Sequence, residues 1–175
     1  AGEKTAFAYS EDLNYAAILA AADVVEAIGR RGQDSAIPSL KRAQSRTPLY
    51  SGVDPIQQKA DADKVAMLHL ADKFARGKDT RVKEVMANIS SVYEVILVAR
   101  SDGKLVPDVR PLIRFNVSVI VEENGKRERG SMGGGGRMGL DYFDPELIQE
   151  YSDEAVRQAL VSLHAVDSPA GTMEV

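Results

Sequence analysis

Residues 112–136 read LIRFNVSVIVEENGKRERGSMGGGG, and this stretch decides the fold. Over residues 112–121, apolar side chains alternate with mostly polar ones, which is the two-residue period of a strand with one buried face. Asn124-Gly125 then supplies the positive φ that a tight hairpin turn demands, and Lys126–Gly130 is the expected return strand. One face comprises Phe115, Val117, Val119 and Val121, and the opposite face comprises Arg114, Asn116, Ser118 and Ile120.

The same two-residue period extends toward the N-terminus. Residues 82–89 and 91–98 are each expected to form a strand, and a turn at Ser101-Asp102-Gly103 leads into a third strand that begins near Leu105. Together with the hairpin, these segments predict a twisted antiparallel meander of three or four strands.

Helical periodicity surrounds the sheet segments. Apolar residues at three- and four-residue spacing predict two long helices, one capped by Ser10 and running to Gly29 and one opening at Asp54-Pro55 and ending near Gly77. A C-terminal helix is expected over about 145–165. The fold class is therefore α+β, with the three helices packed on the sheet. Residues 33–53 show no sustained period and are predicted to form a long connection.

Composition excludes several classes of protein. The chain has 175 residues and a formal net charge of −4, with 44% hydrophobic and 27% charged residues, which is typical of a globular domain. We expect a single domain over residues 1–175. No apolar run is long enough to span a bilayer and no signal segment is evident, so a cytoplasmic location without membrane contact is expected. The acidic balance argues against a nucleic-acid partner.

Residues that could support catalysis or bind a metal are scarce. There is no cysteine, and the two histidines, His69 and His164, are too far apart in sequence for a zinc-binding HExxH helix. Acidic pairs such as Glu122-Glu123 adjoin turns or helix starts, and Ser131 has no neighbouring base. We therefore assign no catalytic residue, no metal ligand and no cofactor to this chain.

The strongest local anomaly is the glycine run Gly133, Gly134, Gly135 and Gly136, followed by Arg137. Glycine is costly to order, so four in a row indicate a close approach of another group or a special backbone conformation. A phosphate cradle would need a Lys followed by Ser or Thr, which the run lacks. An arginine–glycine nucleic-acid segment would need interleaved aromatic residues. Two interpretations remain open, namely a bulged glycine-rich strand that permits close backbone packing and a segment that lines a peptide or substrate cleft.

Several segments, in their order and spacing, resemble the TldD/PmbA family, also called modulators of DNA gyrase, and most closely its TldD-type subunits. The resemblance extends over essentially all of the chain. The segments that carry it are Glu3–Tyr9 (EKTAFAY), Pro48–Tyr50 with Val53–Pro55, Val92–Val98 (VYEVILV), Asp108–Leu112 (DVRPL), Glu122–Gly130 (EENGKRERG), Gly133–Arg137, Glu154–Arg157 and Ser168–Met173 (SPAGTM).

The resemblance implies a zinc metallopeptidase that cleaves unstructured peptides together with a TldE/PmbA-like partner subunit. In that family, a zinc-binding helix with two His and a catalytic Glu begins shortly after the segment that corresponds to Ala170–Met173. This chain ends at Val175. We therefore interpret it as the N-terminal portion of such a subunit, truncated at both ends and inactive as a peptidase on its own, with zinc expected in the full-length protein.

The resemblance also gives the glycine run an expected role. The family's peptide is held in extended form along a sheet, so Gly133–Arg137 is expected to line the substrate cleft or to support the interface with the partner subunit. The alternative is a stand-alone module that binds a peptide or protein without catalysis.

Overall fold

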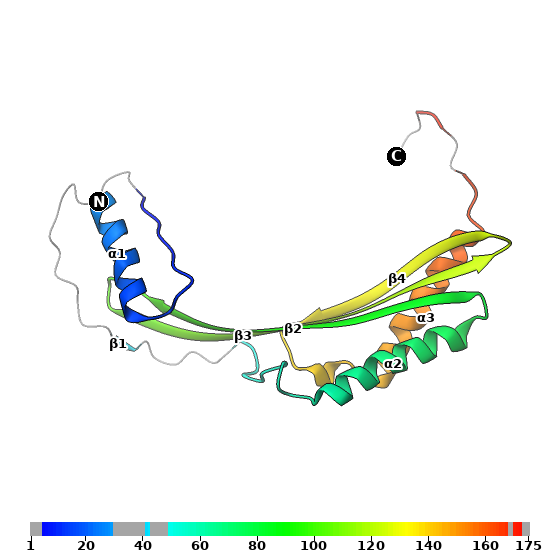
Figure 1. Ribbon diagram of the computed structural model, residues 1–175, viewed down its shortest axis with the longest axis horizontal. Helices are drawn as coiled ribbons and strands as arrows, with labels where there is room; N and C mark the ends of the chain where they lie inside the picture. The colour runs from blue at the N-terminus through cyan, green and yellow to red at the C-terminus, as the bar shows by residue number, and fades with distance from the viewer. Residues whose placement is uncertain (1–4, 30–40, 43–48, 168–169, 173–175) are drawn as a thin grey trace. The chain divides into compact units, whose positions relative to one another are not determined.

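The computed structural model describes residues 5–29, 41–42, 49–167 and 170–172 (Figure 1). The chain divides into two compact units, Ala1–Lys41 with Arg100–Lys104, and Arg42–Ala99 with Leu105–Val175. In chain order the elements are α1 (Tyr15–Gly29), β1 (Lys41–Arg42), α2 (Asp61–Lys78), β2 (Val82–Ala99), β3 (Lys104–Glu123), β4 (Lys126–Gly136), the 3-10 turn η1 (Leu140–Tyr142) and α3 (Pro145–Leu163).

The predicted α+β fold with an antiparallel sheet is confirmed in the second unit. β3 is the central strand and pairs antiparallel with β2 on one side and with β4 on the other. The two-residue β1 also pairs with β3. The β3–β4 turn has positive φ at Asn124 (52°) and Gly125 (81°), as the Asn-Gly dipeptide predicts.

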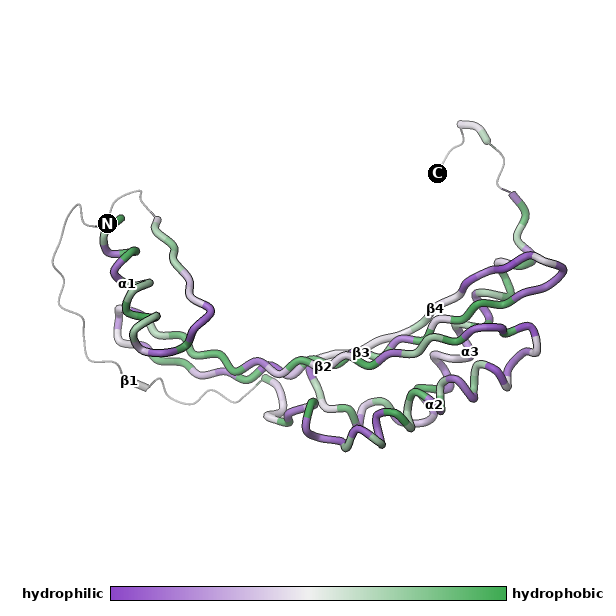
Figure 2. The backbone as a smooth tube through the Cα atoms, in the orientation of Figure 1, coloured by the Kyte–Doolittle hydropathy of each residue, from purple (hydrophilic) through white to green (hydrophobic). Residues whose placement is uncertain are grey.

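The two faces of this sheet differ in what covers them. Helices α2 and α3 lie together on one face, which we call the helix face (Figure 1). The predicted apolar residues of β3 point there, and Phe115, Val117, Val119 and Val121 are fully buried. Hydropathy alternates along the strands accordingly (Figure 2). The other face, which we call the open face, carries the polar positions of β3.

The sequence of α3 explains where this helix begins and which of its sides is buried. Asp144 is the N-cap, with its side chain accepting a hydrogen bond from the Leu147 amide at 2.8 Å, and Pro145 occupies the first turn. The buried residues of α3 recur at three- and four-residue spacing and face the sheet and α2; they are Ile148, Tyr151, Ser152, Ala155, Val156, Ala159 and Leu163.

The predicted starts of the first two helices were wrong, whereas α3 begins where it was expected. α1 begins at Tyr15, because the Asn14 side chain accepts from the Ala17 amide at 2.9 Å, whereas the Ser10 hydroxyl accepts from an amide only two residues on. α2 begins at Asp61 rather than at Asp54-Pro55. The Asp54 carboxylate instead accepts from an amide two residues later, which closes a local turn before the helix.

Two strand boundaries also need correction. The two strands predicted over 82–98 form one continuous strand, β2, which stays in register with β3 past Ser90-Ser91. The return strand does not end at Gly130, because pairing with β3 continues through Gly136. The connection predicted over 33–53 lies largely outside the described residues. No helix in the described part of the chain combines the length and apolar character needed to cross a membrane.

Candidate functional site

The glycine run lies in β4, and its members alternate between the two faces of the sheet. Gly133 and Gly135 pair with Asn116 and Arg114 on the open face. Gly134 and Gly136 pair with helix-face positions of β3. The register is unbroken here, so the run is a regular strand and not a bulge. Because these residues form a strand and not a loop before a helix, the geometry of a phosphate cradle at a helix start is absent from this segment.

Close packing explains why these positions are glycines. A Cβ at Gly133 would lie 2.8 Å from the Asn116 Cα, and one at Gly135 would lie 2.8 Å from the Arg114 Cα. A Cβ at Gly134 would meet the Tyr151 hydroxyl on α3. Side chains at these positions would push against the neighbouring strand or against the helix. The close-packing interpretation of the run is therefore supported.

The outer edge of β4 is a free sheet edge within the described residues. β4 pairs only with β3 there, so its outward N–H and C=O groups have no strand partner. Over Gly133–Gly136, the strand also has no side chains on either face of the sheet, so none from these positions would crowd the side chains of an added strand. Such an edge can accept an additional extended chain.

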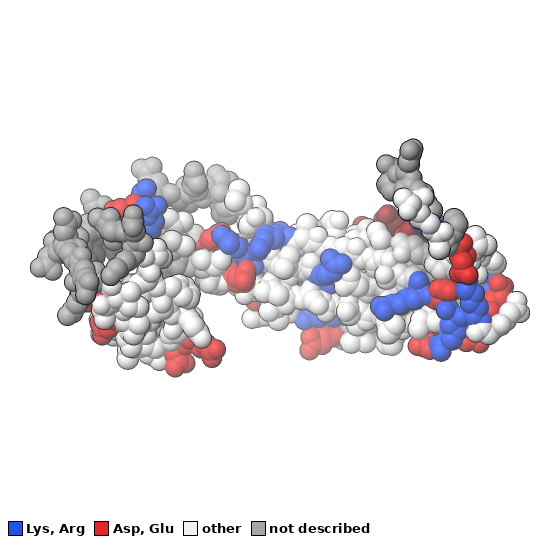
Figure 3. Space-filling model, turned by 90° about the horizontal axis from the view of Figure 1, so that it is seen from above, with Lys and Arg blue, Asp and Glu red and all other residues white. Residues whose placement is uncertain are grey.

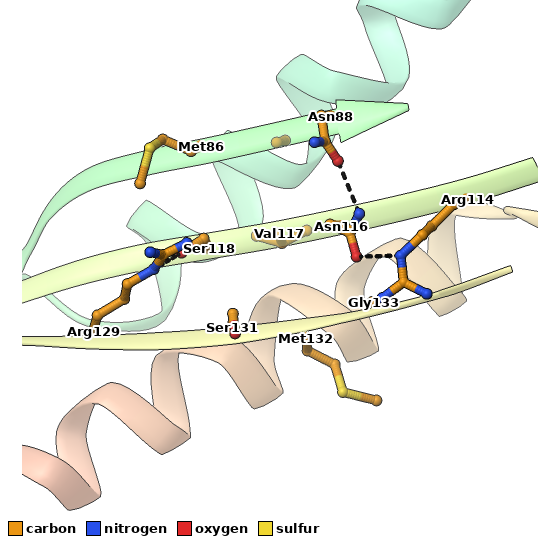
Figure 4. A pocket seen from close by; sticks show the side chains of 11 residues that line it. Met86, Asn88, Arg114, Asn116, Val117, Ser118, Arg129, Ser131, Met132 and Gly133 are labelled. Carbon is orange, nitrogen blue, oxygen red and sulfur yellow. Dashed lines mark hydrogen bonds between the residues drawn. The ribbon is translucent and has the colours of Figure 1, made fainter. Parts of the chain in front are cut away.

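A groove lies on the open face, beside this edge. It has a volume of about 570 Å³, and both polar and apolar side chains line it. In Figure 4 its side chains project from β2, β3 and β4. We call it the open-face groove; it is lined by Met86, Ala87, Asn88, Arg114, Asn116, Val117, Ser118, Arg129, Ser131, Met132 and Gly133.

Two arginines enter the groove, and neutral side chains hold them. The Arg114 Nε donates to the Asn116 side-chain oxygen at 3.0 Å, and the Asn116 amide donates in turn to Asn88 at 3.0 Å. The Arg129 Nε donates to the Ser118 hydroxyl at 2.7 Å. In Figure 4 both guanidinium groups turn toward the middle of the groove, and basic side chains stand over this face in Figure 3.

Arg137 follows directly after the edge strand and occupies a different environment. Its guanidinium lies 5.4 Å from the centre of the Tyr50 ring, and one terminal nitrogen is 3.9 Å from the Glu94 carboxylate. That nitrogen is buried and has no hydrogen-bond acceptor in the described structure. Nearby, the hydrogen bond from Arg110 holds the pKa of the Asp108 carboxyl below its ordinary value. Arg137 therefore brings a buried, unsatisfied donor to the end of β4.

The described residues do not fit a zinc ion. They contain no group of three or more His, Cys, Asp or Glu side chains able to hold a metal. His69 is exposed on α2, and His164 is exposed where α3 ends. The structure therefore brings neither histidine to the glycine run, and we derive no chemical step through a metal.

The sequence reasoning missed the two groove arginines as site residues. The alternation of β3 already placed Arg114, Asn116 and Ser118 on one face, and the Asn124-Gly125 turn fixes which residue of β4 opposes each residue of β3. Counting outward from the turn puts Arg129 opposite Ile120, on the same face as Arg114. The sequence therefore contained enough information to place Arg129 beside Arg114, but only if the strand register and the alternation of side chains were considered together.

Comparisons with known proteins converge on one family. A family profile described as the PmbA/TldA metallopeptidase central domain matches residues 54–163. The chain is 45% identical to the metalloprotease TldD homolog of Haemophilus influenzae over 99% of its length, and 36% identical to that of Buchnera aphidicola subsp. Schizaphis graminum. It spans 37% of the length of each of these relatives.

Solved structures share the fold. A Thermotoga maritima protein described as a candidate modulator of a DNA gyrase superposes with a TM-score of 0.62 at 16% identity, covering 93% of this chain and 36% of that one. A similarly described Bacteroides thetaiotaomicron protein gives a TM-score of 0.62 at 13% identity, covering 86% and 35%. At such low identity, the likeness concerns the arrangement of the backbone alone.

Proposed function

Because this chain belongs to the PmbA/TldA metallopeptidase family, we propose that it supplies the surface on which an unstructured peptide substrate is held in extended form for cleavage. The observation that carries the proposal is the free edge of β4, whose glycine run leaves the backbone accessible. We place the peptide along this edge, antiparallel or parallel to β4.

Strand addition suits a peptidase that acts on unstructured chains. Backbone hydrogen bonds supply affinity without requiring a particular sequence, and side chains add selectivity only where pockets receive them. The strand is rigidly supported, since α3 packs against its helix face and β3 pairs with its inner edge. A supported edge lowers the entropic cost of ordering the peptide.

Arg137 has a defined role in this proposal. Its buried terminal nitrogen lacks an acceptor, and it lies at the end of β4, where a peptide on the edge would continue. About a third of the Arg137 side chain is exposed, and a carbonyl or carboxylate oxygen of the peptide would accept a hydrogen bond from an exposed N–H of its guanidinium. The Tyr50 ring and the Glu94 carboxylate hold the guanidinium in place for that contact.

The zinc implied by the family would be held by residues outside the described part of this chain. The support is that the described residues offer no ligand set and that the curated relatives are much longer. Under this proposal, adding zinc to the 175-residue chain yields no peptide hydrolysis. Zinc-dependent cleavage by this chain alone would contradict it. A TldE/PmbA-like partner subunit stays a prediction.

Selective N-methylation of a peptide tests the strand-addition mode. We would use a fluorescent octapeptide of alternating Ser and Val, together with two derivatives N-methylated at the odd or at the even positions. Alternate N–H groups of a strand point in opposite directions. One derivative should therefore lose at least about tenfold in affinity for this chain by fluorescence anisotropy, while the other binds nearly as the parent does.

Protein variants complete this test. Arg137→Ala should weaken binding of the parent peptide, whereas Arg157→Ala, which removes the same charge from the exposed side of α3, should not. Equal loss with both N-methylated derivatives, or with neither, would contradict pairing along a strand edge.

A further inference from the structure

The open-face groove contains two arginines that differ from the others in the described structure. Every other arginine whose side chain is described has a carboxylate within ion-pair distance. Among the described residues, no carboxylate lies within ion-pair distance of Arg114 or Arg129, although the chain as a whole is acidic. Both unpaired guanidinium groups line one groove.

The arginines are held without being neutralised. Each donates its Nε hydrogen to a neutral side chain, Asn116 or Ser118, which fixes its direction and leaves the terminal nitrogens for another partner. Among the described residues, no acidic side chain lines the groove. Glu84 and Glu122, which lie toward one end of the sheet, are paired with Arg127. Guanidinium groups arranged in this way match carboxylates, which they bind in a planar, two-pronged manner.

We propose that Arg114 and Arg129 bind acidic side chains of the peptide that adds to β4, so that this surface selects segments with Asp or Glu at alternate positions. The inference rests on the proposed function, because it takes the edge of β4 as the peptide's position. It goes further by naming the class of sequence that is preferred.

The positions of both arginines suit a strand at that edge. Arg129 projects from β4 itself, so a side chain of the adjacent strand would be its direct cross-strand neighbour. Arg114 projects from β3, but its partner across the ladder is Gly135, and in Figure 4 its guanidinium extends to Gly133 on β4. The glycines thus let an arginine of the central strand extend over the edge strand.

The spacing along the strand sets the preferred pattern. Arg129 and Gly133 are four residues apart on the same face, or roughly 13 Å at about 3.3 Å per residue. Side chains at positions i, i+2 and i+4 of a paired peptide project onto that face over the same span. Acidic residues at alternate positions can therefore reach both guanidinium groups, whereas consecutive acidic residues point to opposite faces.

Three blocked heptapeptides test the proposal on this chain. The first is Ser-Glu-Ser-Glu-Ser-Glu-Ser, the second has Gln in place of Glu, and the third has the first peptide's composition with the three Glu consecutive. We expect the alternating Glu peptide to bind at least about tenfold more tightly than the Gln peptide in dilute buffer, with the consecutive peptide in between. The difference should shrink as salt is added.

Variants assign the effect to the two arginines. Arg114→Ala and Arg129→Ala should each reduce the Glu-to-Gln affinity ratio several-fold, and the double variant should bring it close to one. Arg157→Ala, with the same change of charge outside the groove, should leave the ratio within about twofold. Circular dichroism would verify that each variant keeps its fold.

Contrary outcomes separate this proposal from the one on which it rests. A Glu-to-Gln ratio near one in the unaltered chain would overturn the inference, as would equal effects of Arg157→Ala and Arg114→Ala. Equal binding of the alternating and consecutive peptides would show a simple anion site and also overturn it. If the Gln peptide remains sensitive to alternate N-methylation, strand addition survives any of these results.

Discussion

The two faces of one sheet in this protein are built from adjacent residues and differ in almost every property. On the helix face, Phe115 is fully buried and its ring lies 5.4 Å from that of Phe143. On the open face, Arg114 is exposed and lines the open-face groove. Burial of apolar side chains supplies the stability of such a sheet, and polar side chains left uncovered remain available to a ligand. The helix face therefore stabilises the fold, and the open face carries the candidate site.

The variant with the largest expected effect on the free energy of unfolding tests whether the fold requires the close approach of α3 to β4. Gly130 of β4 faces α3, and a Cβ there would lie 2.6 Å from the Ala159 amide nitrogen and would also meet the Ala155 carbonyl. Because these are helix backbone atoms, α3 would have to move away. Gly130→Val should cost more than about 3 kcal/mol or abolish folding, as measured by urea denaturation.

The control for this variant is Gly77→Ala at the end of α2, where a Cβ would have no atom within 4 Å. It should leave the unfolding free energy within about 1 kcal/mol of the original, on the stabilising side. Similar losses for both variants would show that the close approach of α3 to β4 does not matter.

The second prediction compares the two faces at neighbouring residues. Phe115→Ala should cost about 3–5 kcal/mol of unfolding free energy, because it leaves a cavity against Phe143 in the core. Arg114→Ala, one residue earlier, should change it by no more than about 0.5 kcal/mol. Chemical denaturation measures the unfolding free energies of both variants and hence the difference between them. A destabilisation by Arg114→Ala close to that of Phe115→Ala would contradict the division of roles between the faces.

The third prediction concerns the start of the helix that covers the sheet. Asp144→Ala removes the acceptor for the Leu147 amide and should cost about 1 kcal/mol of unfolding free energy. Asp144→Asn retains an acceptor at the same position and should cost only a few tenths of that amount. Thermal and urea denaturation of the pair would check this. Equal losses would show that charge, rather than the hydrogen bond, stabilises this end of α3.

Much of the fold could be predicted from the sequence, because it depends on short-range patterns. The alternation around Phe115 and the Asn124-Gly125 dipeptide determine a strand, its faces and its turn within a few residues. The start of α2 could not be predicted in this way. Gln58 follows the expected cap, yet its side chain accepts a hydrogen bond from the Leu140 amide at 2.6 Å. A contact between residues so far apart in sequence leaves no local signal.

The candidate site was predicted only in part, for a related reason. The glycine run drew attention to this part of the chain, but the return strand was expected to end at Gly130, before the run begins. Pairing with β3 and contact with α3 outweigh that propensity, so β4 continues to Gly136. Arg114 lies on β3 and Arg129 lies on β4. Only the register between these two strands shows that both residues line the same groove.

The smallest effect on stability is expected at Asp79, which lies at one end of the sheet and on neither of its faces. Asp79 precedes β2 and accepts hydrogen bonds from the Arg81 backbone at 2.9 Å and from its guanidinium at 2.9 and 2.8 Å. Arg81 also donates to Glu123 at the end of β3, at 3.1 Å. The Arg81 side-chain hydrogen bonds lower the pKa of the Asp79 carboxyl from 3.8 to about 2.

Acid titration of Asp79→Asn tests whether this contact adds stability. A carboxyl whose pKa is lowered by folding stabilises the protein above its unfolded value of 3.8, and that contribution is lost as the pH falls through its folded value of about 2. The variant should therefore be less stable than the original at pH 7, by less than Asp144→Ala, and the difference should vanish between about pH 4 and pH 2. Urea denaturation at several pH values measures it. A difference that persists unchanged at pH 2 would mean that Asp79 acts through hydrogen-bond geometry alone, and that its charge does not stabilise this end of the sheet.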